Sequence, residues 1–216
     1  MARKLERSAL EFVPIKGDLE DLKEAAEHCR GCDLYKHATQ TVFGEGKSTA
    51  RIVLVGEQPG DQEDRQGRPF VGPAGKLLNR ALKEVGIEEK EAYVTNVVKH
   101  FKFEPRGKRR LHKTPREIEV RACYPWLLRE IDEIEPEIIV CLGATAAKAM
   151  LGNQFRITKQ RGQFFPYASA PWIMATVHPS SILRAPDDEA RHQAFDDFKK
   201  DLDRVAYLLK HGRPPG

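Results

Sequence analysis

Short apolar runs that end in glycine or a polar loop alternate with helical patterns along most of this 216-residue chain. The runs at 50–56 and 137–143 are continuously apolar at their centres and close on glycine, which is typical of strands buried on both faces of a parallel sheet. Two further strands are expected over 92–95 and 172–177. Because helical patterns separate the runs, the sequence predicts a three-layer αβα sandwich around a central, mostly parallel four-stranded sheet.

The helical segments carry recognisable start signals. Asp18 is placed as an N-cap, Pro73 takes the first position of its helix, and 114–117 has the capping-box pattern Thr-Pro-Arg-Glu. A single domain over 1–216 accommodates all elements, with flexible ends expected over 1–17 and 211–216. The predicted helices span 18–28, 73–85, 115–134, 144–151 and 187–210.

Composition excludes several classes of protein. The chain is 40% hydrophobic and 31% charged and has no apolar run of about 18 residues, so no membrane span is expected. The first six residues lack the apolar region of a secretory signal. We therefore expect a cytoplasmic monomer, in which four cysteines would seldom form disulfides.

Three unusual segments follow predicted strands. They are 57–72, which is polar and rich in Gly and Pro, 96–113, which is strongly basic, and 178–184, which begins His-Pro-Ser-Ser. Ligands of parallel sheets bind beyond the carboxyl ends of the strands. The three segments should meet there, and this convergence predicts an active site.

The basic segment is the most charged part of the chain. Eight Lys or Arg residues and one acidic residue, Glu104, lie between Lys99 and Arg116, whereas the whole chain has a net charge of +4. A basic patch on an otherwise mildly acidic body indicates a polyanionic partner. A solvated loop without a ligand is the alternative.

The turn after the first strand, Gly-Glu-Gln-Pro-Gly-Asp, places two carboxylates at the sheet edge. Glu57 and Asp61 could act on a ligand there or could cap local amides. Phe70, in the same polar loop, could stack on a flat base or belong to the core. The chain has neither a GxGxxG nor a Walker sequence, so no nucleotide cofactor is expected.

Together the motifs resemble those of the uracil-DNA glycosylase superfamily. Gly-Glu-Gln-Pro-Gly, Pro-Phe-Val-Gly-Pro-Ala-Gly, Val-Thr-Asn and His-Pro-Ser-Ser occur in the expected order between about Cys29 and Arg184. The Cys-x-x-Cys at 29–32 is similar to the iron–sulfur branches. Lys-Arg-Arg-Leu-His at 108–112 resembles the extra loop of UdgX-type proteins, which bind covalently to uracil-containing DNA.

The resemblance implies a uracil pocket. Asn96 would recognise the edge of the base with one donor and one acceptor, which disfavours cytosine. Phe70 would stack on the ring, and backbone amides near Gln58 and Asp61 would complete the pocket.

It also implies catalytic roles. His178 would hydrogen-bond the oxyanion that develops on the leaving base, and Glu57, with Asp61 in the same turn, would stabilise the cationic sugar or orient the nucleophile. Ordinary glycosylases use water as that nucleophile. In the UdgX-type interpretation the nucleophile is His112, whose neutral imidazole attacks C1′; alternatively, His112 only contacts phosphate.

The expected partner is uracil-containing DNA, with single strands favoured because an unpaired base is extruded at least cost. Two alternatives stay open: a conventional glycosylase that turns over, and a non-catalytic iron–sulfur protein that binds DNA lesions. The residues expected to contact DNA are Lys108, Arg109, Arg110, Lys113, Ser180, Ser181 and Arg184.

A structural [4Fe-4S] cluster is the expected cofactor. The Cys-x-x-Cys lies at the end of a predicted helix, without the strand that precedes a thioredoxin-type pair. The resemblance implies Cys29, Cys32 and Cys123 as ligands, and His100 stands where related enzymes have a fourth cysteine. Histidine can replace cysteine on such irons. Cys141 is the competing fourth ligand, but inside an apolar strand a thiol packs as a small hydrophobe.

Overall fold

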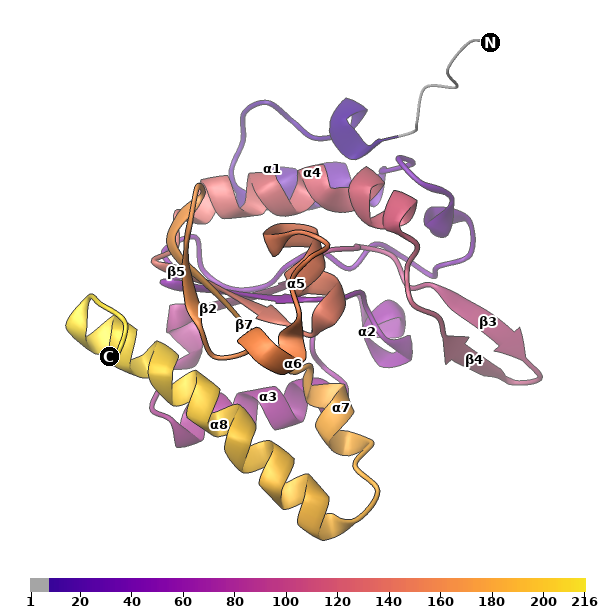
Figure 1. Cartoon of the computed structure of the whole chain (residues 1–216). Coiled ribbons are helices and arrows are strands. Elements are labelled where there is room, and N and C mark those ends of the chain that lie inside the picture. The colour runs from indigo at the N-terminus through magenta and orange to yellow at the C-terminus, as the bar shows by residue number, and fades with distance from the viewer. Residues whose placement is uncertain (1–7) are drawn as a thin grey trace.

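The computed structural model describes residues 8–216 and has the predicted three layers (Figure 1). The central sheet has five strands in the order β2-β1-β5-β7-β6, in which all pairs are parallel except β6 with β7. The expected αβα fold and its four parallel strands are therefore confirmed, and the strand count is corrected from four to five. The strands are β1 (Ile52–Gly56), β2 (Ala92–Asn96), β5 (Ile138–Leu142), β6 (Phe164–Tyr167) and β7 (Ala170–Thr176).

The additional strand β6 lies at the edge of the sheet, antiparallel to β7. Its sequence, Phe-Phe-Pro-Tyr, is short and contains a proline, which a strand tolerates at an edge or at an irregularity. The register of the β6–β7 pair shifts at this proline, between Phe165 and Tyr167. Because the run is short and contains a proline, the sequence pattern did not predict this strand.

Helices cover both faces of the sheet. Helices α1, α4 and α5 pack on one face, and α3, α7 and α8 pack on the other (Figure 1). Within residues 8–216, 3₁₀ helices lie at Ala9–Glu11 (η1), Asp33–Lys36 (η2) and Glu89–Glu91 (η3). The α-helices are α1 (Leu19–Glu27), α2 (Asp61–Gln66), α3 (Pro73–Glu84), α4 (Glu117–Ile134), α5 (Ala144–Leu151), α6 (Ile157–Gln160), α7 (Pro179–Leu183) and α8 (Asp188–His211).

Strand β1 shows why its sequence is continuously apolar. Val53 and Val55 pack in the core under α1 and α4, whereas Ile52 and Leu54 pack in the core under α3 and α8. Successive side chains of a strand point to opposite faces, so both faces need apolar residues when both are covered. All five residues of β1 are buried.

Two segments expected as loops contain regular structure. The polar segment after β1 includes α2, and the basic segment forms a β-hairpin of β3 (Phe103–Arg106) and β4 (Arg109–His112). The hairpin projects from the body of the protein beside α2 (Figure 1). Gly107, in the turn between its strands, has a φ of +58°, a conformation that glycine adopts without strain.

Helix α4 begins later than its capping pattern predicted. Its N-cap is Arg116 instead of Thr114, and the Arg116 N–H donates to the Glu119 carboxylate over 2.7 Å. Glu119 reaches back to the cap from the third helical position, as in one half of a capping box. Thr114 is thereby left to line the cavity described below.

The N-terminal segment is packed where the structure describes it. Ala9, in η1, is fully buried in the core, in contrast to the flexible end expected over 1–17. Residues 1–7 of that range lie outside the described residues. No helix between residues 8 and 216 combines the length and apolar character needed to cross a membrane.

Candidate active site

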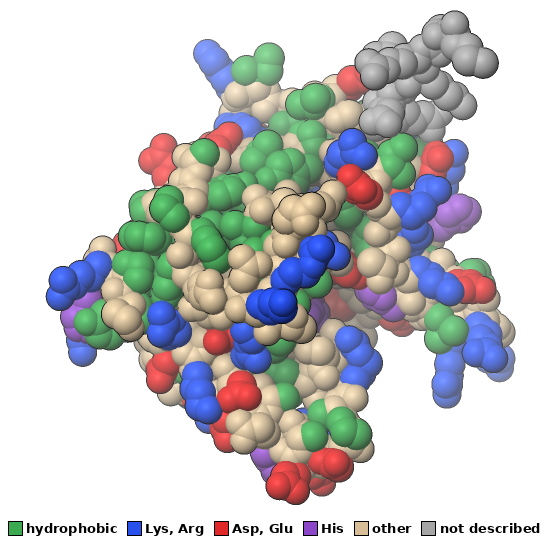
Figure 2. Space-filling model, viewed as in Figure 1, with side chains coloured by type: hydrophobic (Ala, Val, Ile, Leu, Met, Phe, Trp, Pro, Cys, Tyr) green, Lys and Arg blue, Asp and Glu red, His purple; other side chains and the backbone are tan. Residues whose placement is uncertain are grey.

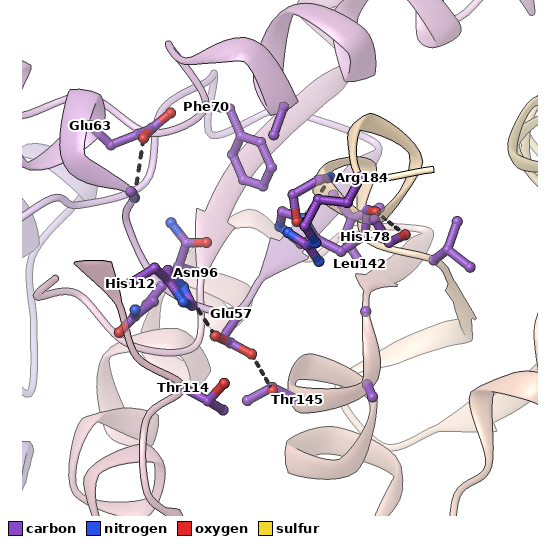
Figure 3. A pocket seen from close by; sticks show the side chains of 18 of the residues that line it. Glu57, Glu63, Phe70, Asn96, His112, Thr114, Leu142, Thr145, His178 and Arg184 are labelled. Carbon is purple, nitrogen blue, oxygen red and sulfur yellow. Dashed lines mark hydrogen bonds and ion pairs between the residues drawn. The ribbon is translucent and has the colours of Figure 1, made fainter. Parts of the chain in front are cut away.

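A cavity of about 710 Å³ opens at the carboxyl ends of the parallel strands. All three segments expected to form the active site contribute to it, and so does the segment that follows β5. Its lining includes Glu57, Gln58, Phe70, Asn96, His112, Thr114, Gly143, Thr145, His178, Ser180, Ser181 and Arg184 (Figure 3).

Close approach of backbone and side chains shapes the base of the cavity. A Cβ on Gly56 would lie 2.3 Å from Asn96 Oδ1 and 2.9 Å from Phe70 Cζ, so only glycine fits at the end of β1. Phe70 itself has a φ of +54°, which is uncommon for a residue with a bulky side chain. Its carbonyl lies against Gly75, where an added Cβ would approach to 1.6 Å. These contacts hold the Phe70 ring at the cavity.

Glu63 joins the two glycine-rich stretches that flank this region. Its carboxylate accepts the N–H of Gly60 at 3.1 Å and the N–H of Gly72 at 2.7 Å. The residue lies in α2 and lines the cavity. The sequence did not point to it, because its partners are backbone groups that only the folded loop brings within reach.

Glu57, directly after β1, connects two sides of the cavity. One carboxylate oxygen lies 3.3 Å from His112 Nε2, and the other accepts a hydrogen bond from the Thr145 hydroxyl (Figure 3). Thr145 lies in the first turn of α5 and was not predicted. The strand-then-glycine pattern at β5 could have indicated it, because that pattern places 143–145 at the same edge of the sheet.

His112, the last residue of β4, is half-exposed at the mouth of the cavity. Burial and the nearby Arg184 charge lower the pKa of its imidazole, and the Glu57 carboxylate opposes them. The neutral form is thereby favoured near pH 7. A neutral imidazole keeps one unprotonated ring nitrogen, which is the form that can act as a nucleophile.

His178 caps the N-terminus of α7, and this contact fixes its tautomer. Its Nδ1 accepts the Ser180 N–H at 3.1 Å and lies 2.8 Å from the Ser180 hydroxyl oxygen. Burial, assisted by the charges of Arg184 and His112, lowers the pKa of His178 to about 4. The ring is therefore neutral at pH 7, with its proton on Nε2. It can donate one hydrogen bond from that atom to a ligand.

Asn96 ends β2 and is buried beside Gly56. The residues that follow it extend the pairing with β1, because Val97 N–H donates to the Gly56 carbonyl and Val98 N–H to the Glu57 carbonyl. The Asn96 side chain carries one donor group and one acceptor group into the cavity lining.

Gln58 holds the hairpin in place. Its side-chain Nε2 donates to the carbonyls of Lys102 and Lys113, both at 3.1 Å, and its Oε1 accepts the Lys102 N–H at 3.0 Å. A single amide therefore ties the loop after β1 to both ends of the hairpin that carries His112. The sequence suggested only a backbone role for this position.

Two residues expected in the site have other contacts. The Arg110 guanidinium lies 2.5 Å from Asp61 Oδ1 and 2.6 Å from Asp64 Oδ2, and Asp61 also pairs with Arg65. Asp61 does not line the cavity. Asp61 and Arg110 thus form a clamp between α2 and the hairpin, a contact that the sequence did not indicate. Their mutual attraction satisfies both charges.

The other basic residues remain on the surface. Lys108 and Arg109 are exposed at the hairpin end, where Lys and Arg side chains gather at the right of Figure 2. Lys113 forms an exposed ion pair with Glu104 at 2.6 Å. Ser181 donates from its hydroxyl to the His178 carbonyl, which is a local contact within α7.

Comparison with known proteins identifies the family. Residues 43–203 match the family described as the uracil DNA glycosylase superfamily. The chain belongs to the uracil-DNA glycosylase superfamily. It is 40% identical over 195 residues to the type-4 uracil-DNA glycosylase of Thermotoga maritima, an alignment that covers 90% of this chain and 96% of the relative. The type-4 enzyme of Sulfurisphaera tokodaii is 41% identical over 190 residues, which cover 84% and 82% of the two chains. The chain therefore falls in the type-4 family.

In this uracil-DNA glycosylase family member, Cys29, Cys32 and Cys123 pack in the same core cluster, under α1 and α4. Trp126 Nε1–H donates to Cys29 Sγ at 3.2 Å, and the Lys99 N–H donates to Cys123 Sγ at 3.3 Å. Burial raises the pKa of the Cys123 thiol to about 12, and the positive charge of Lys99 opposes this shift. N–H donors to sulfur suit an iron–sulfur cluster.

His100 is buried, directly after Lys99 in the chain, and has a defined tautomer. The Thr41 hydroxyl donates to the Ala26 carbonyl, so its oxygen must accept from His100 Nε2, 3.0 Å away. The second nitrogen, Nδ1, then carries the lone pair that a metal requires. By contrast, Cys141 is fully buried in β5 and contacts the Met150 sulfur. Within residues 8–216, no three His, Cys, Asp or Glu side chains converge on a site for a single metal ion.

Proposed function

We propose that this chain cleaves the N-glycosidic bond of uracil in DNA, the activity for which its type-4 relatives are named. The observation that supports this proposal is the meeting of Glu57, Asn96 and His178 in one cavity at the carboxyl edge of the sheet. Each supplies a group that uracil removal requires. The other proposed pocket residues are Phe70, as a stacking surface, and Gln58, through its backbone amide.

The proposed reaction separates charge between base and sugar. Uracil leaves with a negative charge, which the Nε2–H of neutral His178 stabilises by donating a hydrogen bond, as an oxyanion hole does. Positive charge develops at C1′ of the sugar, and the Glu57 carboxylate stabilises it. Asn96 selects uracil through a paired donor and acceptor, because cytosine presents the reverse pattern on that edge.

We further propose that His112 captures the sugar. The imidazole lies 3.3 Å from Glu57, the carboxylate that would face the cationic carbon, and its lowered pKa favours the nucleophilic form. A bond from a ring nitrogen to C1′ would leave the DNA attached to the protein. The type-4 relatives favour the alternative, in which water attacks the same carbon and the enzyme turns over.

One incubation with a uracil-containing oligonucleotide separates these possibilities. Covalent capture gives a protein–DNA species that survives boiling in SDS and at most one uracil released per protein. Turnover gives uracil in excess of protein with no such species. A protein that binds the oligonucleotide and releases no uracil would contradict the glycosylase proposal altogether.

Replacing Glu57 by glutamine should slow uracil release and cross-linking together. Both reactions pass through the same cationic sugar, and loss of one preorganised electrostatic group typically costs about 10²–10³ in rate. Single-turnover rates measured by uracil release and by denaturing gel check the expectation. Glu45→Gln is a matched control, since Glu45 pairs with Arg68 outside this cavity. A variant that releases uracil at the normal rate would remove Glu57 from the chemistry.

DNA binding should depend on salt through the exposed hairpin residues. Lys108→Ala with Arg109→Ala should flatten the slope of log affinity against log salt by about 1.4, because each phosphate contact on single-stranded DNA contributes about 0.7. Fluorescence anisotropy over a salt series measures this slope. Lys210→Ala with Arg213→Ala is the control, as the Leu209 carbonyl nearby contacts Arg51 at the opposite end of the sheet. If wild type, the hairpin variant and the control variant have equal slopes, the DNA does not contact Lys108 and Arg109.

Other residues are also proposed to contact the DNA. They are Lys113, Ser180, Ser181 and Arg184.

We also propose that Cys29, Cys32, Cys123 and Nδ1 of His100 hold a [4Fe-4S] cluster. The shared core cluster of the three thiols, the N–H donors to Cys29 and Cys123, and the His100 tautomer fit such a group. When bound, the cluster would supply structural cross-linking between the N-terminal segment, the start of the basic segment and α4. Cys141 lies in β5 and packs against Met150 of α5, so we assign it to the core and not to the cluster.

A further inference from the structure

A buried charged pair lies beneath the cavity, outside the residues that line it. Lys99 and Glu130 have side chains that are 1% and 0% exposed, and Lys99 Nζ lies 2.5 Å from Glu130 Oε2. Removing two charges from water is costly, and apolar residues of similar volume are often at least as stable in such places. Stability alone therefore does not account for this pair.

The pair is part of a fully bonded network. Glu130 accepts the hydroxyls of Tyr93 and Thr95 and the N–H of Gly44. Lys99 has three ammonium hydrogens, and besides Glu130 its partners are Thr95 Oγ1 at 2.6 Å and the backbone carbonyl of Asn96 at 2.9 Å. The last contact connects the network to the cavity, because Asn96 is a lining residue.

Asn96 stands where β2 ends, so its orientation depends on what fixes the chain around it. The Val97 and Val98 N–H groups attach the following residues to the backbone of β1. The Lys99 ammonium fixes the remaining group, the Asn96 carbonyl, from below. A rotation of the peptide plane at Asn96 would carry its side-chain amide away from the cavity, and Lys99 opposes that rotation.

We infer that Lys99 is a positioning residue for base selection: its ammonium, balanced by Glu130, holds the Asn96 amide in the orientation that reads uracil. This inference rests on the proposed function and adds to it a determinant that does not touch the substrate. A positioning role for Lys99 differs from a purely structural role in one respect. A positioning residue acts only through Asn96, so the effect of replacing Lys99 on uracil release should vanish when the Asn96 amide is absent.

The test is a double-mutant cycle measured by single-turnover uracil release. Lys99→Met combined with Glu130→Gln removes both charges and leaves the Lys99 backbone N–H on Cys123 unchanged. This change should slow uracil release about tenfold with Asn96 present and less than about twofold in the Asn96→Ala background. The difference between the two effects has the size of the interaction energy usually measured between residues in contact. An equal loss in both backgrounds would overturn the inference.

Two comparisons separate positioning from stability. Tyr93→Phe removes one hydrogen bond to Glu130 and keeps both the ion pair and the Lys99 ammonium on the Asn96 carbonyl, so it should lower the melting temperature while release stays within about threefold of wild type. If release instead falls tenfold in this folded variant, release follows the stability of the network, and the positioning role is overturned. Arg51→Met with Glu137→Gln, a pair at the other end of β1, is the matched control. Iron content, recorded for every variant, should not change.

The wild-type protein in the same assay keeps the two proposals distinct. Failure of wild type to release uracil would contradict the proposed function itself. Normal release by wild type, together with an effect of Lys99 that is independent of Asn96, would contradict only the positioning role. A readout without catalysis is the side-chain amide NMR signal of Asn96 during titration with free uracil. It should shift in wild type and respond much less in the Lys99→Met, Glu130→Gln protein.

Discussion

Replacing His112 by serine should abolish the adduct that survives boiling in SDS and produce a protein that releases uracil repeatedly. Serine cannot provide the ring nitrogen that attacks C1′, whereas Glu57, Asn96 and His178 stay in place because the strand pairing of the hairpin involves backbone groups. The space left by the imidazole, which is half-exposed at the cavity mouth, admits water to the same carbon. Denaturing gels at saturating DNA, with uracil release measured alongside, check both halves of this expectation.

The alternative role for His112 is contact with a phosphate. If His112 has only this role, the His112→Ser variant should bind DNA more weakly but should still form the adduct when the DNA is saturating. His192→Ser, on the exposed side of α8, is a control for the loss of a histidine. An adduct that persists in His112→Ser would refute capture by this residue and direct attention to Lys108 or Lys113, whose amines could form a Schiff base with an opened sugar.

Alanine at Cys29, Cys32 or Cys123 should remove the brown colour of the protein and prevent stable folding. Metal binding at structural sites contributes about 10–16 kcal/mol in small zinc domains, which is comparable with the whole stability of a typical domain, about 5–15 kcal/mol. Loss of one ligand should therefore leave little folded protein. Iron and sulfide analysis, with thermal denaturation followed by circular dichroism, provides the measurement.

The same series tests the fourth ligand. His100→Ala should lose part of the iron, and Cys141→Ala should keep all of it while losing only about 1 kcal/mol for one deleted buried atom. Cys141→Ala is thus a matched control for removal of a thiol from the core. Iron lost from Cys141→Ala and retained in His100→Ala would reverse the assignment of these two residues.

The parallel strands and the edge that carries the site could be predicted, because burial on both faces leaves a continuous apolar signature. At β1 and β5 this signature also locates the turn that follows, which is why Glu57 could be placed next to the cavity before the fold was known. The same reasoning placed Asn96 and His178. For these residues, position in a strand pattern determines position in space.

Other residues could not be placed in this way, because their roles depend on partners that are distant in the sequence. Arg110 reads as a phosphate ligand in a basic run, and only the packing of α2 beside the hairpin reveals its pairing with Asp61 and Asp64. Gln58 is similar, since its amide meets carbonyls more than forty positions away, at separations of 44 and 55 residues. Local sequence contains no signal for either contact.

The way the hairpin is attached has a consequence for how new chemistry can be added to an old scaffold. Lys102 and Lys113, where the hairpin leaves and rejoins the body, are hydrogen-bonded to each other at 3.0 Å, and the Gln58 side chain spans both. The two ends of the excursion are thus adjacent, and chain can be inserted or removed between them without displacing the sheet. The proposed nucleophile is carried on a hairpin that Gln58 holds at its base and that Asp61 and Asp64 of α2 hold through Arg110. Grafting 102–113 together with a glutamine at position 58 and these two aspartates is therefore the smallest transplant that could convert a turning-over relative into a protein that tags its own substrate.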